Sequence, residues 1–457
     1  MASPDQEHQH ELESRLNHFS YSIRRSALEE LAAMEQAGVI KLPVPLEMAN
    51  MHCHTFFSFN AYAFSPCGLA WMAKKRGLSV IGKVDFDVLD GVEEYLKACD
   101  LVGVRGSAAI ESRVFFPEFS TREINSPGEP GVYYAMGIGL TQDSAPDPGA
   151  GILSDMQARA AARNREMIRR LNDYLEPVMI DYDEDVLPLT PAGNATERHI
   201  LAAYLEKVEH ASPQPLNFWA QKLAIPANRL SSIYQDGPAF QNQVRARLMK
   251  KGGPGYSLPG EGSFPDLREF NRAINACDSL VCAAWLDGLS AGEQALDELL
   301  TALIDQGASA LNIIPDRNWN IADPDLKKIK LANLYRVAEL AGRLDLPIHV
   351  GTEMNTFGQK WVDDFDAPEL APLRQAFMDG AYFIYGHTVM QRSLGLGYHS
   401  PWAGVHLPTR AAKNAFYTRL GRKVPPGAAG RAVLANVVAQ SGGLAAVKPD
   451  DFVTFIP

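Results

Sequence analysis

From residue 48 onward, short runs of apolar and β-branched residues alternate with longer runs whose apolar residues recur every three or four positions. The short runs predict strands and the longer runs predict amphipathic helices. We expect eight strands, at residues 48–55, 78–85, 107–116, 131–140, 279–286, 310–315, 346–354 and 381–387. Helices are expected between most of them, at residues 65–77, 90–100, 290–307 and 325–344. This alternation indicates parallel strands with helical crossovers, and seven or eight such units favour a closed α/β barrel.

One internal region and both ends of the chain depart from the alternation. Residues 152–275 are mostly helical in pattern and contain a glycine- and proline-rich passage at 251–266, which indicates an inserted subdomain. A helical pattern also covers residues 10–37, ahead of the first strand. The sequence therefore predicts five parts: 1–47, an N-terminal helical segment; 48–151, the first part of the barrel; 152–275, the helical insertion; 276–390, the second part of the barrel; and 391–457, a C-terminal helical cover.

The composition predicts a folded, soluble protein. Of its 457 residues 46% are apolar and 21% are charged, and the formal net charge is −11. With that charge and no long basic run, we expect no nucleic-acid partner. Five scattered cysteines indicate reduced thiols and not a disulfide framework. The polar start does not fit a signal peptide, and no apolar run approaches the ~20 residues of a membrane helix. We therefore expect a cytoplasmic protein with a small-molecule substrate.

The first strand carries the candidate chemistry. His52 and His54 lie two residues apart in NMHCHTFFSF, and residues at this spacing on a strand face the same side, roughly 6.6 Å apart. Both imidazoles could then reach one metal ion at about 2.0–2.1 Å. In a parallel barrel the carboxyl ends of the strands form the site. Carboxylates fall at or near several such ends: Asp85, Asp87, Glu111 and Glu353.

The order of these motifs, over roughly residues 48–360, resembles the PHP (polymerase and histidinol phosphatase) superfamily of metal-dependent phosphoesterases. The family's opening H-x-H-T-x-x-S-D is similar to HCHTFFSF at 52–59. Its D-H-D turn and later D-G are similar to VDFDVLDG at 84–91, and its G-x-E strand to AAIES at 108–112. The resemblance implies a distorted (β/α)7 barrel, similar to a TIM barrel, with a helical insertion.

Several ligand positions of that family hold other residues here. The replacements are Phe59, Phe86, Tyr134, Trp285 and Asn355. Phenylalanine has no lone pair, tryptophan offers only an N–H donor, and tyrosine would have to ionise. The positions that serve one metal ion in the family still hold competent ligands: His52, His54, Glu111 and Glu353. The resemblance thus implies a single divalent transition-metal ion (Zn, Mn, Fe or Ni) where relatives hold three.

The resulting functional hypothesis is a phosphoesterase-like, metal-dependent hydrolase. Asp85 or Asp87 would transfer protons or, alternatively, orient a histidine ligand. Arg317 would bind an anionic group of the substrate. Further substrate contacts are expected from Lys83, Arg113, His387 and Asn355. The alternative from another class is a catalytically inactive barrel that binds a small molecule without metal.

A serine hydrolase is the lesser alternative. GLSAG at 288–292 fits G-x-S-x-G, and Asp363 or Asp364 followed by His387 would complete the order of a triad. However, Glu293 stands three residues after Ser290, which is the spacing of a capping box at a helix start. Capping is therefore the favoured interpretation of Ser290.

Overall fold

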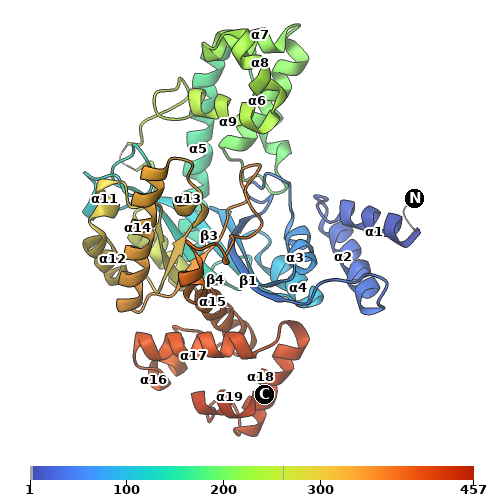
Figure 1. Cartoon of the computed structure of the whole chain (residues 1–457), viewed down its shortest axis with the longest axis vertical. Coiled ribbons are helices and arrows are strands. Elements are labelled where there is room, and N and C mark those ends of the chain that lie inside the picture. Colours follow the sequence, from blue (N-terminus) through green and yellow to red (C-terminus); the bar gives the residue numbers. More distant parts are fainter. Residues whose placement is uncertain (1–3, 261, 457) are drawn as a thin grey trace.

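Seven strands form one sheet that closes into a barrel in the computed structural model, which describes residues 4–260 and 262–456 (Figure 1). The strands follow one another around the sheet in chain order: β1 (Leu46–His54), β2 (Leu78–Phe86), β3 (Arg105–Phe115), β4 (Val132–Leu140), β5 (Leu280–Trp285), β6 (Ala310–Ile313) and β7 (Ile348–Val350). Closure comes from the residues after β7. The Glu353 N–H donates to His52 O at 2.7 Å, and the His54 N–H donates to Glu353 O at 2.8 Å. The α/β barrel expected from the sequence is confirmed.

The alternation predicted parallel strands throughout, but one strand runs in the opposite direction. β4 is antiparallel to both β3 and β5, while the other neighbouring pairs are parallel. Only a short 3-10 turn, η1 (Pro117–Phe119), lies between β3 and β4, and no helix crosses over there. A parallel return needs a crossover of about a dozen residues or more, usually a helix, so the chain turns back instead.

The barrel helices cover the outside of the sheet. They are α3 (Pro66–Lys75), α4 (Val92–Val102), α10 (Leu267–Ala276), α11 (Ala291–Gln294), α12 (Leu296–Asp305), α13 (Asp316–Trp319) and α14 (Pro324–Arg343). Two further helices, α1 (Pro4–Arg15) and α2 (Tyr21–Gln36), precede β1. Because both faces of the sheet are covered, a strand such as β5 is a continuous apolar run.

The insertion stands over the carboxyl ends of the parallel strands (Figure 1). It contains α5 (Gly149–Leu175), α6 (Glu197–Ala211), α7 (Pro215–Leu223), α8 (Ala227–Gln235), α9 (Gly237–Leu248) and the short turns η2 (Tyr182–Val186) and η3 (Leu187–Leu189). The 27-residue helix α5 leads from the barrel into the insertion, which has a hydrophobic cluster of its own around Leu171, Tyr204 and Trp219. This arrangement places insertion side chains opposite the barrel mouth.

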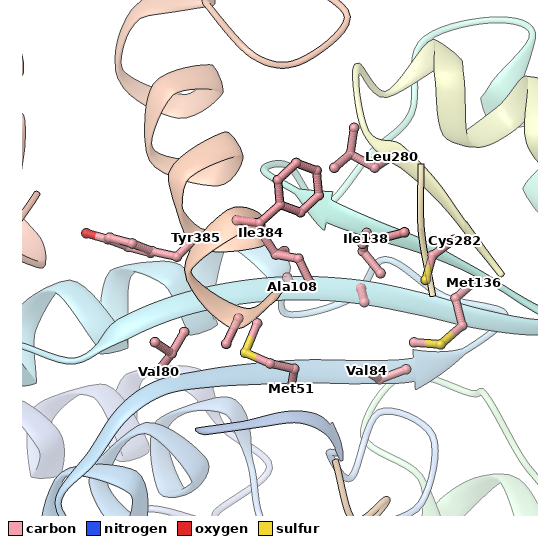
Figure 2. Packing of buried hydrophobic residues seen from close by; sticks show 14 of the residues in the cluster. Met51, Val80, Val84, Ala108, Met136, Ile138, Leu280, Cys282, Ile384 and Tyr385 are labelled. Atoms are coloured by element: carbon pink, nitrogen blue, oxygen red, sulfur yellow. The ribbon is translucent and has the colours of Figure 1, made fainter. Parts of the chain in front are cut away.

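The prediction of an eighth strand at residues 381–387 is wrong. These residues lie in the middle of helix α15 (Arg374–Leu394), which packs against the amino-terminal end of the barrel. Figure 2 shows Ile384 and Tyr385 among side chains of the strands. Residues 380–388 of this helix are all buried, so this stretch lacks the polar face by which a helix is recognised.

The C-terminal helices cover this same end of the barrel, away from the insertion (Figure 1). They are α16 (Pro401–His406), α17 (Arg410–Lys423), α18 (Gly427–Gln440) and α19 (Pro449–Phe455). None of the described helices is both long and apolar enough to cross a bilayer.

Candidate metal centre and its cavity

The two histidines of β1 converge with a carboxylate of β3. The Nε2 atoms of His52 and His54 lie 3.5 Å and 3.6 Å from Glu111 Oε2. Potential ligand atoms of these three residues all lie within 4.8 Å of one another, and all three residues are buried. Parallel pairing of β2 with β3 and the β1–β2 pairing bring these strand ends to one side of the barrel.

The ring of His52 is held in the tautomer that a metal ligand needs. Its Nδ1 lies 3.0 Å from Asn312 Oδ1, an atom that can only accept, so Nδ1 carries the hydrogen. The Asn312 amide is oriented by its Nδ2, which donates toward His349 O at 3.4 Å. The Nε2 lone pair of His52 therefore points into the site, and that buried atom has no hydrogen-bond partner among the described residues.

His54 is oriented in the same way through a serine. Ser58 Oγ donates to Asp85 Oδ1 at 2.6 Å, which leaves it to accept from His54 Nδ1 at 3.1 Å. His54 Nε2 is likewise buried and without a partner in the part of the chain described. Asp85 also accepts from Lys83 Nζ at 3.0 Å and from Thr55. Asp85 and Lys83 are thus fully buried supports beneath the histidine, and neither lines the cavity described below.

This donor set suits a cation. Two nitrogen lone pairs facing one carboxylate oxygen at about 3.5 Å repel each other unless a positive charge lies between them. Burial alone lowers the pKa of His52, but the carboxylates of Glu111 and Glu353 outweigh it and the pKa is raised. Burial and the neighbouring His52 lower the pKa of His54. The position therefore favours one positive charge.

Glu353 lines the same cavity, but its carboxylate forms an ion pair with an arginine and does not join the other three ligands. Arg317 Nη2 contacts both of its carboxylate oxygens at 2.7 Å. Although burial acts in the opposite direction, the Arg317 guanidinium lowers the pKa of Glu353 to about 2. The expected fourth ligand is therefore paired with an arginine, and the described residues bring together three ligand side chains, not four.

A cavity of about 400 Å³ lies between the barrel mouth and the insertion. Of the residues expected in the site, it is lined by His52, Asp87, Glu111, Arg113, Arg317, Glu353 and Asn355. Asp87 accepts from Ser112 Oγ at 2.5 Å, and its N–H donates to Glu111 O at 3.0 Å. Asp87 is thus the aspartate of the pair that faces the cavity.

His387 does not lie in the site. It belongs to α15, where it is buried against Gly139 near the end of β4. Because β4 runs antiparallel to β3, that end of β4 is at the amino-terminal side of the barrel, away from Glu111. The expected substrate contact depended on a strand at residues 381–387, and a helix replaces that strand.

Aromatic residues shape the cavity wall. Phe86 stacks on the ring of His54, with centroids 4.6 Å apart and planes at 20°. Phe59, Tyr134 and Trp285 line the cavity. Trp285 Nε1 is buried and has no hydrogen-bond partner among the described residues.

Ser290 acts as a helix cap. Its Oγ accepts from the Glu293 N–H at 3.2 Å at the start of α11. The Glu293 carboxylate accepts from the N–H groups of residues 286–288 and not from that of Ser290, so half of the predicted capping box forms.

Sequence reasoning missed the basic residues that the insertion contributes to the cavity. They are Arg163, Arg198, Arg245 and Lys250. In sequence they lie among other charged residues of a mostly helical pattern, which is typical of a solvated face. Only the placement of the insertion over the barrel turns them toward a common space.

No family model and no curated protein matches the chain. Among solved structures it is similar to an amidohydrolase from Chromobacterium violaceum with bound sulfate and no metal: identity is 14%, the TM-score is 0.47, and the match covers 72% of this chain and 96% of that one. It is also similar to a candidate metal-dependent phosphoesterase from Bifidobacterium adolescentis, at 18% identity and a TM-score of 0.45, over 73% of this chain and 98% of that one. At these values neither likeness bears on the chemistry of this chain.

Proposed function

We propose that this chain is a metal-dependent hydrolase of anionic esters, a divergent PHP-like barrel with a single-ion site. His52, His54 and Glu111 would hold the ion. The observation that carries the proposal is the pair of buried Nε2 atoms that face one carboxylate without any hydrogen-bond partner among the described residues. Buried polar atoms normally have partners, and this arrangement is relieved by a cation.

Two imidazoles and one carboxylate suit Zn, Mn, Fe or Ni. Three protein ligands leave a coordination position open, as in catalytic and not structural zinc sites. When bound, such an ion supplies Lewis-acid polarisation of the substrate and a more acidic water.

The surrounding residues would bind the substrate and move protons. Asp87 faces the cavity and would accept a proton from the attacking water. The Arg317 guanidinium contacts Glu353 only through Nη2, so Nε and Nη1 can donate to an anionic substrate group. Arg113 and Asn355 line the same space, and Trp285 Nε1 adds a further donor. Together they would orient an ester next to the ligands and stabilise charge that develops on its oxygens.

Metal analysis combined with a substrate panel tests this function. We expect about one equivalent of a transition metal after reconstitution, and chelator-sensitive hydrolysis of phosphate or carboxylate esters. His54→Gln should lose both properties, whereas His210→Gln, on an exposed part of α6, should keep both. Clearly substoichiometric metal in the reconstituted wild-type protein would sink the proposal.

One observation favours the alternative of a metal-free binding barrel. The Arg317–Glu353 ion pair already places a fixed cation at the mouth, and it occupies a carboxylate that a larger metal cluster would use. In that case anions would bind equally well with and without chelator, and no ester in the panel would be hydrolysed.

A further inference from the structure

The charges that line the cavity are opposite in sign to those of the whole protein. The chain carries a formal net charge of −11. Yet six cationic side chains face four carboxylates around the cavity, even before any metal ion is counted. The cations are Arg113, Arg163, Arg198, Arg245, Lys250 and Arg317, and the carboxylates are Asp87, Glu111, Glu197 and Glu353. Positive charge concentrated in one concave space attracts anions.

The excess lies on the insertion wall. Arg245 and Lys250 both pair with Glu197, at 2.9 Å and 2.8 Å, so one carboxylate serves two cations. Arg198 stands beside them without any carboxylate within ion-pair distance among the described residues. Its guanidinium donates instead to two neutral groups, Asn242 Oδ1 at 3.0 Å and Thr356 Oγ1 at 2.7 Å.

Three features make the position of Arg198 electrostatically unfavourable unless an anion is present. It lies in the first turn of α6, where the helix dipole is positive and disfavours a cation. Arg245 lies nearby, and burial and this neighbour lower the pKa of Arg198 to about 10. Glu197 and Glu353 act in the opposite direction and the charge is retained at neutral pH, but no carboxylate among the described residues lies within ion-pair distance of it.

We propose that Arg198, Arg245 and Lys250 form a second anion-binding subsite, and that the substrate carries two anionic groups. This inference rests on the proposed function, because the group to be hydrolysed would lie at the barrel end, beside the metal ligands and Arg317. A carboxylate or phosphate at the far end of the same molecule would lie against the insertion wall. Both ends belong to one continuous cavity, and its aromatic lining would contact the part of the substrate between them.

Paired ligands that cannot be hydrolysed test the subsite separately from catalysis. Alkylphosphonates with two to four methylenes are compared with the same compounds carrying a terminal carboxylate, by calorimetry on the zinc-loaded full chain. We expect at least one carboxylated compound to bind tenfold or more tightly than its partner. This gain should fall between 50 and 300 mM NaCl, because it is electrostatic.

Two variants test whether the gain in affinity from the terminal carboxylate depends on Arg198. Arg198→Gln should reduce the gain to less than threefold, and it should fold because it breaks no ion pair. Arg229→Gln removes an equal charge from an exposed position on α8 outside the cavity and should leave the gain unchanged. Circular dichroism confirms the fold of both. Equal affinities for the two ligand series, no binding by either, or equal losses in the two variants would each overturn the subsite.

The outcome also separates the two proposals. If esters are hydrolysed but the terminal carboxylate brings no gain, the hydrolase stands and the subsite fails. If the gain is present and depends on Arg198 but no ester is hydrolysed with any metal, the subsite stands and the hydrolase fails.

Discussion

Replacing each of two glutamates by glutamine distinguishes a three-ligand from a four-ligand metal site. Both carboxylates face the cavity, and both were expected as ligands. Glu111 Oε2 lies at about 3.5 Å from both Nε2 atoms, whereas both oxygens of Glu353 are bound by Arg317. Glu111→Gln should therefore remove a ligand, and Glu353→Gln should remove only the partner of an arginine.

The expected magnitudes differ accordingly. Loss of a charged, largely buried contact costs roughly 2–4 kcal/mol, since interactions with ionised groups are about twice as strong as neutral ones. At 1.4 kcal/mol per tenfold change, this weakens zinc affinity by roughly 30- to 1,000-fold. Asn312→Ala, which frees the ring of His52, should cost about 10- to 100-fold, as is typical of groups that orient a ligand. Glu353→Gln should change the affinity by less than about tenfold.

Competition with a chromophoric chelator measures these affinities, and thermal unfolding provides an independent check. Free zinc at 100 times Kd stabilises the folded state by about 2.7 kcal/mol. At the same zinc concentration this stabilisation should stay above about 1.4 kcal/mol in Glu353→Gln and fall below about 1 kcal/mol in Glu111→Gln. If Glu353→Gln weakens zinc as much as Glu111→Gln does, Glu353 is a ligand and the three-ligand site is refuted.

Three further predictions concern stability and the serine. Arg24→Ala should destabilise the fold by about 3–5 kcal/mol in urea unfolding, because it leaves Glu94 buried and unpaired where α2 meets α4; an effect below 1 kcal/mol would contradict this. Burial and the nearby Asp316 raise the pKa of Asp363 to about 8. The native state thus keeps a proton that the unfolded chain releases near pH 4, so stability should fall as pH rises from 4 to 8. Asp363→Asn should reduce the loss of Tm between pH 5 and pH 8, and an unchanged loss would be evidence against this assignment. Ser290→Ala should cost about 1 kcal/mol as a lost helix cap and leave hydrolysis intact, which an ester assay checks.

The alternation of apolar runs was enough to locate all seven strands, because the strands are largely buried on both faces. It could not give the direction of β4, which depends on what lies between β3 and β4 and not on either strand. Nor could it distinguish α15 from a strand, since a helix with no exposed face loses its periodic signal. Because residues 381–387 were predicted to be a strand, His387 was wrongly expected at a strand end in the site.

The candidate ligands on β1 and β3 were predictable because strand geometry fixes which residues share a face. Glu353 was harder, because it lies beyond β7 in a left-handed backbone conformation with φ of 67°, so strand spacing does not set its direction. The cations of the insertion were beyond reach, since their meeting point depends on how a separate helical unit docks over the mouth.

The aromatic and cationic residues of the cavity have complementary effects on the candidate metal site. Phe86 covers one face of the His54 ring and Ser58 binds its Nδ1, so Nε2 is the nitrogen left to bind a metal ion. Arg317 supplies a fixed positive charge next to Glu353, where a further ion would otherwise be needed to balance the carboxylate. A guanidinium cannot activate water, but it binds the oxygens of an anionic group in two-point contact. A site with one ion and a nearby arginine would depend more on positioning a charged substrate and less on metal activation. In such a site, Arg317→Lys should raise KM more than it lowers kcat.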